Sequence, residues 1–142
     1  MIDLLAWSLR KCSGCTCVTY LGTMPLKQRN SILYRFQHDP EVSVLIMSLR
    51  AGGEGLNLQA ANYVLIVEPW WNPAVEDQAI QRCHRIGQTR EVHAIRFVAS
   101  DTIESRMMEL QEKKRLVFQG TIDSQTQAFS ELCHEDLQFL FH

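Results

Sequence analysis

The most informative stretch of this chain is Trp70-Trp71-Asn72-Pro73, followed after a short gap by Gln78-Ala79-Ile80-Gln81-Arg82-Cys83-His84-Arg85-Ile86-Gly87-Gln88. A turn bounded by a proline opens the stretch, and apolar residues then recur at helical spacing. The spacing predicts an amphipathic helix over residues 74–88, with one stripe buried against a core. The residues of that stripe are Val75, Ala79, Ile80, Cys83 and Ile86.

Two arginines, Arg82 and Arg85, stand three residues apart in this predicted helix. They lie with Gln78 on the flank between the apolar stripe and the polar side. A guanidinium group is planar and always charged, so two of them on one flank can bind a phosphate across a cleft. A solvated helix shoulder is the plainer alternative for such a charge pattern. The polar side itself is formed by Asp77, Gln81, His84 and Gln88.

Apolar runs at residues 42–47, broken only by Ser43, and at residues 63–67 predict buried parallel strands. Helical patterns alternate with the strands, which is typical of an α/β fold. We expect a doubly wound parallel sheet with helices on both faces and with functional loops at the carboxyl ends of the strands. Further strands are predicted over 16–21 and 91–98, and further helices over 2–11, 25–37 and 101 to about 118, the last opened by a capping box, Asp101-Thr102-Ile103-Glu104.

The C-terminal end has a different pattern. A polar link is predicted over 120–127, and a short helix over 130–141 brings apolar side chains back onto the body. We therefore divide the chain into a lobe, residues 1–120, and a linker with a packing helix, residues 121–142.

Composition excludes several classes of protein. Apolar residues make up 46% and charged residues 21%, which is ordinary for a globular domain. No apolar run approaches the roughly 20 residues that cross a bilayer, and five cysteines in no regular framework suit a reducing compartment. The net charge is −2, but residues 1–50 carry six Lys or Arg against three Asp or Glu. We expect a soluble intracellular protein with a modestly basic first third, which is the candidate for phosphate contact.

Three cysteines, Cys12, Cys15 and Cys17, lie close together in the sequence. A structural zinc site needs four ligands, commonly in two pairs. No second pair follows nearby, because Cys83 and Cys133 are distant. We therefore expect no metal site.

Three motifs in a fixed order resemble those of one protein family. Residues 78–88 resemble the sixth motif of the Swi/Snf-type DNA translocases of helicase superfamily two, and Trp70-Trp71-Asn72-Pro73 resembles the segment before it. Met47-Ser48-Leu49-Arg50-Ala51-Gly52-Gly53-Glu54-Gly55-Leu56-Asn57-Leu58 resembles the fifth motif, and residues 4–5 and 20–24 match the fourth-motif region. Residues 135–141 resemble an ending found in the branch with RING-bearing DNA-repair translocases and the helicase-like transcription factor.

The resemblance implies a fold and a function. The fold would be the second RecA-like lobe of a two-lobed motor, N-terminally incomplete and with a C-terminal helical extension. The function would be that of a motor on double-stranded DNA in chromatin remodelling or DNA repair, driven by ATP with Mg²⁺. The implied partners are DNA or nucleosomes, the N-terminal lobe and the ubiquitin pathway, in the nucleus and not at a membrane.

The same resemblance implies roles for single residues. Arg82 and Arg85 would be arginine fingers that stabilise charge on the γ-phosphate. The tryptophans are interpreted from the residues themselves: two adjacent ones on extended chain cannot point the same way, so we expect one of Trp70 and Trp71 to be buried and the other to brace the DNA-facing loop against the arginine helix. Glu54, at a position that is usually apolar, would weaken the DNA contact. The nucleotide-binding residues would be Gln78, Gly53, Gly55 and Gln88, and the DNA-binding residues would be Ser48, Arg50, Gly52, Trp70 and Trp71.

Two parts of an ATP site are not in the sequence. A phosphate-cradling loop with Lys and an acidic Mg²⁺ box are needed, and the chain has neither a Gly-Lys dipeptide nor an Asp-Glu-x-His box. We expect the first lobe to supply both, and the chain alone to be catalytically silent. The alternative is a non-enzymatic fragment that binds DNA or a partner. An unrelated small nucleotide-binding protein is disfavoured by the missing loop.

Overall fold

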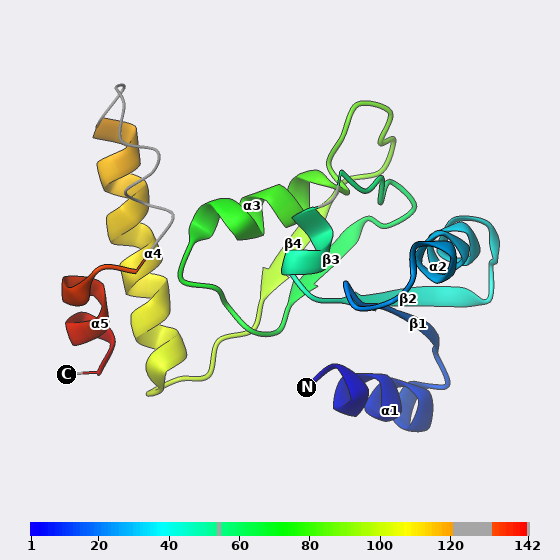
Figure 1. The fold of residues 1–142 in the computed structure, drawn as a ribbon, viewed down its shortest axis with the longest axis horizontal. Helices are drawn as coiled ribbons and strands as arrows, with labels where there is room; N and C mark the ends of the chain where they lie inside the picture. The colour runs from blue at the N-terminus through cyan, green and yellow to red at the C-terminus, as the bar shows by residue number, and fades with distance from the viewer. Residues whose placement is uncertain (54, 121–131, 142) are drawn as a thin grey trace.

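The computed structural model describes residues 1–142 except 54, 121–131 and 142, and Figure 1 shows its fold. Each helix and strand that the sequence predicts is present, although residues 130 and 131 of the last helix and most of the predicted link lie outside the described part. The elements are α1 (Ile2–Ser13), β1 (Thr16–Tyr20), α2 (Leu26–His38), β2 (Val42–Met47), the 3-10 helix η1 (Arg50–Gly53), β3 (Tyr63–Ile66), α3 (Pro73–Gln81), β4 (His93–Arg96), α4 (Ile103–Gly120) and α5 (His134–Phe141).

The first sheet is a parallel pair, β1 and β2, that contacts both α1 and α2. Cys17 on β1 and Ile46 on β2 pack with Ala6 of α1 in a core cluster, and each is at most 8% exposed. Tyr20 points to the opposite face, where Arg29 of α2 lies over its ring, and it is only 1% exposed. Helices on both faces are therefore confirmed for this pair.

The second sheet is the parallel pair β3 and β4, in register from Tyr63 opposite His93 to Ile66 opposite Arg96. The parallel α/β class is as predicted, but the described strands form two sheets instead of one continuous sheet. The reason lies in the connection, because β2 leads into a loop with one 3-10 turn and no ladder joins β2 to β3 among the described residues.

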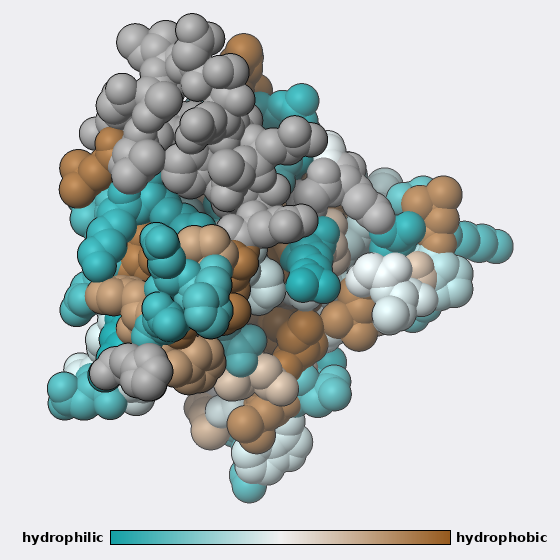
Figure 2. Space-filling view, turned by 60° about the vertical axis from the view of Figure 1, so that its left-hand side comes forward, coloured by the Kyte–Doolittle hydropathy of each residue, from teal (hydrophilic) through white to brown (hydrophobic). Residues whose placement is uncertain are grey.

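One face of the β3–β4 pair is open. Alternate side chains of a strand point to opposite faces, and here Ile66 is buried whereas Tyr63 and Leu65 are 57% and 55% exposed. Parallel sheets usually have both faces covered, so this pair departs from the predicted architecture. Hydrophobic side chains also reach the surface between hydrophilic ones on the side of α4 and α5, which Figure 2 brings forward.

Helix α3 begins where the sequence indicates and ends early. Asn72 caps it, since its Oδ1 accepts the N–H of Ala74 at 3.0 Å, and Pro73 at the first position has no N–H to satisfy. The helix ends at Gln81 instead of residue 88. The carbonyl oxygen of Arg82 accepts the N–H of Leu58 at 3.1 Å, so this acceptor serves another segment of the chain.

Residues 82–88, which we call the arginine loop, continue from α3 as turns. Cys83 is 4% exposed and ends the buried stripe, and burial raises the pKa of its thiol. Ile86 is 100% exposed, so its predicted burial is wrong. Gly87 has a φ of 100°, a left-handed conformation that a continuing helix cannot contain.

Helix α4 has a cap that differs by one residue from the predicted one. Thr102 is the capping residue, because its Oγ1 accepts the N–H of Glu104 at 3.2 Å, whereas the Glu104 carboxylate accepts the N–H of Ala99, which precedes the cap, at 2.8 Å. Asp101 has a φ of 57° and lies before the cap. The helix is therefore capped one residue later than predicted, and the predicted capping box is wrong, because Glu104 bonds the N–H of Ala99 instead of that of the capping residue.

Helix α5 packs on α4 through charge and apolar contacts. Lys114 Nζ lies 2.8 Å from Asp136 Oδ2, and Lys113 Nζ lies 3.6 Å from the centre of the Phe139 ring. Leu140 is 5% exposed. The C-terminal helix thus returns to the body, as predicted, and α4 and α5 stand side by side in Figure 1.

We expect Asp136→Asn to lower the free energy of unfolding by about 0.5–1 kcal/mol at pH 7. Burial raises the pKa of Asp136, but hydrogen bonds from Lys114 and from the N–H of Cys133 outweigh it and hold the pKa below its ordinary value of 3.8. The stabilisation is therefore complete above that value and is lost as the pH falls through the lower folded pKa. Urea unfolding at pH 7 and pH 3 measures this.

Glu135→Gln, a change at the exposed neighbour on the same helix, is the control for this experiment. It removes one carboxylate without touching Lys114. A loss for Asp136→Asn that is as large at pH 3 as at pH 7 would contradict the assignment.

Candidate functional site

Arg82 and Arg85 line one open depression on the surface. They do not both project from the helix, as the sequence suggested, because Arg82 is the C-cap of α3 and Arg85 follows in the arginine loop. The turn after the helix still brings both to the same opening. The lining residues are Gln78, Gln81, Arg82, His84, Arg85 and Ile86.

The guanidinium of Arg82 carries an unusual polar atom. Its Nε is buried and has no hydrogen-bond partner among the described residues. A buried N–H without an acceptor is costly, and most such groups in folded proteins are paired. Arg85 is exposed beside it. The pair therefore suits an anionic oxygen ligand such as a terminal phosphate.

The depression has no group suited to a divalent cation. None of its lining residues is a carboxylate, and Mg²⁺ prefers carboxylate and phosphate oxygens. Among the described residues, no three His, Cys, Asp or Glu side chains lie close enough together to hold a metal ion. The residues present fit the phosphate end of a nucleotide and leave its metal ion to other groups.

Gln78 and Gln88, both predicted nucleotide ligands, lie in different surroundings. Gln78 lines the depression and is exposed. Gln88 is half-buried, and its Nε2 donates to the carbonyl oxygens of Gln59 at 3.0 Å, Ala61 at 2.9 Å and Cys83 at 3.3 Å. Its predicted place on the solvated side of a helix is wrong, because this amide holds the loop backbone together.

Residues 48–55, which we call the glycine loop, begin directly after β2, at the carboxyl end of the strand. Ser48 Oγ accepts the N–H of Ala51 at 3.3 Å and so helps to start η1. Arg50 is exposed, and its guanidinium lies over the Trp70 ring at 5.4 Å. A cation stacked on an indole at this distance is a favourable contact. The predicted DNA residues Ser48, Arg50 and Trp70 are therefore neighbours.

The glycines of this loop have different conformations. Gly52 and Gly53 belong to η1. Gly55 has a φ of 67°, in the left-handed region that favours glycine. Glu54, which the sequence analysis noted, lies outside the described residues.

Neither Trp70 nor Trp71 is fully buried, so the expectation that one of them serves the core is wrong. Both are half-buried, with ring centres 6.2 Å apart. Arg50 lies over Trp70, whereas Lys114 of α4 lies over Trp71 at 4.9 Å. The pair thus connects the glycine loop on one side with α4 on the other.

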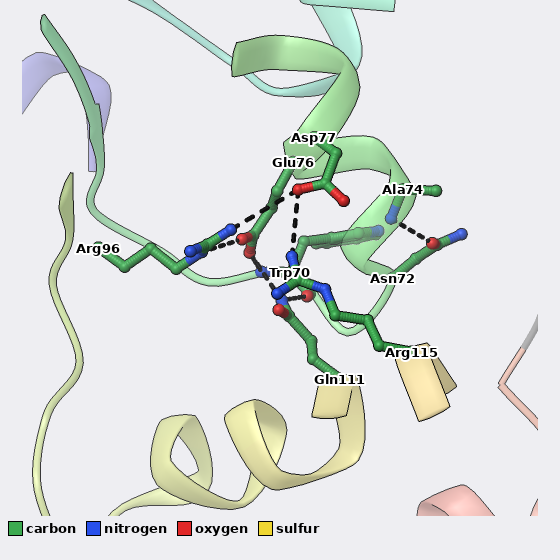
Figure 3. Close-up of polar contacts among 8 residues, drawn as sticks. All are labelled: Trp70, Asn72, Ala74, Glu76, Asp77, Arg96, Gln111 and Arg115. Carbon is green, nitrogen blue, oxygen red and sulfur yellow. Dashed lines mark hydrogen bonds and ion pairs between the residues drawn. The ribbon is translucent and has the colours of Figure 1, made fainter. Parts of the chain in front are cut away.

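Sequence reasoning missed the buried carboxylate at the centre of this region, Glu76, which is 0% exposed. Its Oε1 accepts the backbone N–H of Trp70 at 2.7 Å and Gln111 Nε2 at 2.9 Å. Its Oε2 lies 2.6 Å from Arg96 Nε. Figure 3 shows these side chains converging from the tryptophan segment, α3, β4 and α4.

A second carboxylate, Asp77, extends this network to the surface. Asp77 Oδ1 lies 3.1 Å from Arg115 and 3.8 Å from Arg96. The helical pattern placed Asp77 on the solvated side, but the side chain pairs with these two arginines. Gln111 also donates to the carbonyl oxygen of Trp70. A signal was present in the sequence, since Glu76 stands at helical spacing before Ala79, Ile80 and Cys83 of the apolar stripe. We call Glu76, Arg96 and Gln111 the Glu76 cluster.

The sequence matches a known family and long relatives. Residues 1–87 match the family model of the helicase conserved C-terminal domain. The chain is 44% identical over 141 residues to ATP-dependent helicase rhp16 of Schizosaccharomyces pombe, a match that covers 99% of this chain and 16% of that protein. It is 42% identical over 140 residues to DNA repair protein RAD5B of Arabidopsis thaliana, covering 99% of this chain and 11% of that protein. The chain thus spans a small part of these relatives, and they confirm the branch that the sequence analysis named.

Solved structures have the same fold. The crystal structure of the C-terminal part of the Fun30 ATPase domain matches with a TM-score of 0.78 and 26% identity, covering 97% of this chain and 41% of that chain. The SWI2/SNF2 ATPase core domain of Sulfolobus solfataricus matches with a TM-score of 0.68 and 30% identity, covering 98% of this chain and 28% of that chain. The predicted RecA-like lobe is confirmed by these matches.

Proposed function

The chain belongs to the helicase conserved C-terminal domain family and has the fold of a Swi2/Snf2 ATPase C-terminal lobe, and from this premise we propose that it is the second lobe of an ATP-dependent translocase on double-stranded DNA. The whole protein would hydrolyse ATP and act in the nucleus, in DNA repair or chromatin remodelling. Nucleosomes and ubiquitin-pathway proteins are further partners that the family branch suggests.

One observation carries this proposal. Arg82 and Arg85 line the same open depression, and the buried Nε of Arg82 lacks an acceptor among the described residues. A nucleotide phosphate presented by a first lobe would meet the two guanidinium groups at this opening. Two positive guanidinium groups would then offset the negative charge that develops during phosphoryl transfer.

The nucleotide would be ATP with Mg²⁺, shared between two lobes. The bound magnesium ion would neutralise phosphate charge and hold the phosphates in place for attack by water. The lining of the depression has no carboxylate for that ion, so this chain would hold only the phosphate end. Gln78, at the edge of the depression, would help to orient the arginines. Gly53 and Gly55 would let the loop backbone approach the nucleotide.

The DNA contact would form on the glycine loop. Arg50 is exposed and stacked on Trp70, and Ser48 and Gly52 lie on the same loop. Phosphate contacts of this kind position a protein on DNA without reading its sequence. The backbone of Trp70 is bonded to Glu76 of α3, and α3 leads directly to Arg82. This series of contacts supports a coupling between DNA binding at the glycine loop and the position of the two arginines.

The proposal is tested by ATP hydrolysis in a two-lobed protein, which is the whole chain preceded by a first motor lobe from a relative. We expect hydrolysis by the two-lobed protein to rise at least about tenfold when double-stranded DNA is added. The chain alone should have no activity, because it lacks the phosphate-cradling loop. Initial rates of phosphate release measure both.

Two controls make this result specific. The supplied lobe alone must lack the DNA-stimulated rate, and single-stranded DNA should stimulate less than duplex. If the two-lobed protein bound duplex DNA but hydrolysed no ATP, the non-enzymatic alternative would be favoured. Hydrolysis that duplex DNA does not change would contradict the translocase.

A further inference from the structure

The arginine loop is held by a segment that precedes β3. Residues 57–61, which we call the Gln59 segment, contact it at two carbonyl oxygens. The N–H of Leu58 donates to the carbonyl oxygen of Arg82 at 3.1 Å, and Gln59 Nε2 donates to the carbonyl oxygen of Ile86 at 2.5 Å. These two acceptors lie on either side of Arg85 in the sequence. The part of the loop that carries both arginines is therefore tied at each end.

The side chain of Gln59 is oriented by a neighbour. Asn57 Nδ2 donates to Gln59 Oε1 at 3.2 Å, and the N–H of Gln59 donates to Asn57 Oδ1 at 3.2 Å. With its oxygen used in this way, the amide turns its nitrogen towards Ile86. The donor to the arginine loop is thus held in place before any ligand binds.

The arginine loop comes close to Gln59 because of a glycine. Gly87 has a φ of 100°, and a Cβ at this position would lie 3.2 Å from Gln59 Nε2. Contacts that short are rare, so a larger residue would push the loop and the amide apart. The bond between Gln59 and Ile86 thus depends on the special backbone at residue 87.

Side chains of the arginine loop and of the residue just beyond it also donate hydrogen bonds to the Gln59 segment. Gln88 Nε2 donates to the carbonyl oxygens of Gln59 and Ala61, and Arg90, just beyond the loop, donates to that of Ala60. The two segments therefore bond each other reciprocally. Beyond α3, little regular structure supports the arginine loop, so these bonds decide where it lies.

We propose that Gln59 is a positioning residue for Arg82 and Arg85. It touches neither phosphate nor DNA and acts through the loop backbone. Its effect on hydrolysis rests on the proposed function, whereas its hold on the loop does not. An arginine that stabilises a transition state must be placed closely, since a displacement of about 1 Å can cost ~100-fold in rate.

The test is Gln59→Glu in the two-lobed protein. This change keeps the shape and the Oε1 acceptor but replaces the Nε2 donor with an oxygen that repels the carbonyl oxygen of Ile86. We expect kcat for DNA-stimulated ATP hydrolysis to fall about tenfold or more, with a smaller change in KM for ATP. Gln28→Glu, on the exposed side of α2, makes the same chemical change elsewhere and should leave kcat unchanged.

A double variant separates positioning from general damage. If Gln59 acts through the arginines, Gln59→Glu will cost much less in a protein that already carries Arg85→Ala. An equal fold-loss in both backgrounds would overturn the proposal, and so would an unchanged kcat in the single variant. A melting temperature near that of Gln28→Glu shows that the fold is intact.

A second measurement on the isolated chain does not depend on catalysis. Amide hydrogen exchange over residues 82–88 should be faster in Gln59→Glu than in Gln28→Glu, with exchange in α1 unchanged. Equal exchange over 82–88 in the two variants would overturn the inference. If Arg85→Ala left hydrolysis intact, the proposed function would fail, and the exchange rates would still decide whether Gln59 holds the loop.

Discussion

Arg85→Ala lowers the DNA-stimulated ATP hydrolysis of the two-lobed protein by ~10³-fold or more, while the chain keeps its fold. Arg85 is exposed in the depression beside Arg82, so removing its side chain leaves no cavity in a core. A charge that meets the phosphate only as the lobes close stabilises the transition state more than the bound substrate. We therefore expect the loss in kcat, with KM for ATP changed little.

Arg85→Lys recovers only a small part of the lost rate. Lysine restores the positive charge, but its single ammonium cannot give the paired hydrogen bonds of a planar guanidinium. A full recovery would mean that charge alone matters at this position. Steady-state kinetics of the wild-type, Ala and Lys proteins, at saturating duplex DNA, separate these possibilities.

Arg10→Ala is the matched control for this prediction. Arg10 is an exposed arginine on α1, away from the arginine loop in Figure 1, and its removal should change the rate less than about twofold. Circular dichroism melts should be alike for the two alanine variants. Retention of hydrolysis after Arg85→Ala would exclude Arg85 as a finger and with it the main argument for the site.

The strands and most helices could be predicted because short-range patterns decide them. The run from Val42 to Met47 is apolar except for Ser43, and the strand has these bounds in the structure. The pairing of strands could not be predicted in the same way, because it depends on contacts between distant residues. No pattern within β2 or β3 indicates that they form separate sheets.

The end of α3 could not be predicted for a related reason. Cys83 and Ile86 continue the helical spacing, yet Cys83 is buried and Ile86 is fully exposed. The path of the arginine loop is set by Gln59 and Gln88, whose side-chain amides donate hydrogen bonds to carbonyl oxygens far away in the sequence. Helical periodicity does not include such bonds. It therefore predicted that the two arginines lie near each other but not the conformation that brings them together.

The Glu76 cluster shows that a charged residue cannot be assigned to the surface from its type alone. An acidic residue in an amphipathic helix is usually solvated, and Glu76 would be assigned so by its type. Glu76 stands at helical spacing from Ala79, Ile80 and Cys83 of the buried stripe, however, and on that face Arg96 and Gln111 satisfy it. Because those partners come from β4 and α4, only the folded chain brings them together.

Glu76→Ala is expected to destabilise the chain by ~3–5 kcal/mol, the largest effect on folding that we predict. Three donors converge on this carboxylate, namely the N–H of Trp70, Arg96 Nε and Gln111 Nε2. Removing it leaves a guanidinium and two N–H groups without their acceptor in a buried place. Urea unfolding followed by tryptophan fluorescence measures the change, because the backbone N–H of Trp70 is bonded to Glu76.

Glu76→Gln keeps the measurement possible if the alanine variant does not fold, since domains of this size have only about 5–15 kcal/mol of stability. The amide is the same size and retains one acceptor oxygen, but its NH₂ faces a donor, so we expect a loss of ~2 kcal/mol. Glu112→Gln, at an exposed position on α4, is the matched control and should change stability by less than about 0.5 kcal/mol.

A double variant shows whether the charge of Glu76 is paired with that of Arg96. Glu76→Gln with Arg96→Met removes both partners, so its cost should be smaller than the sum of the two single losses. Strictly additive losses would mean that Arg96 and Glu76 do not stabilise each other. Because Glu76 also holds the backbone of Trp70, the same variants should increase amide exchange at residues 70–72, which links the stability of the cluster to the proposed DNA-binding loop.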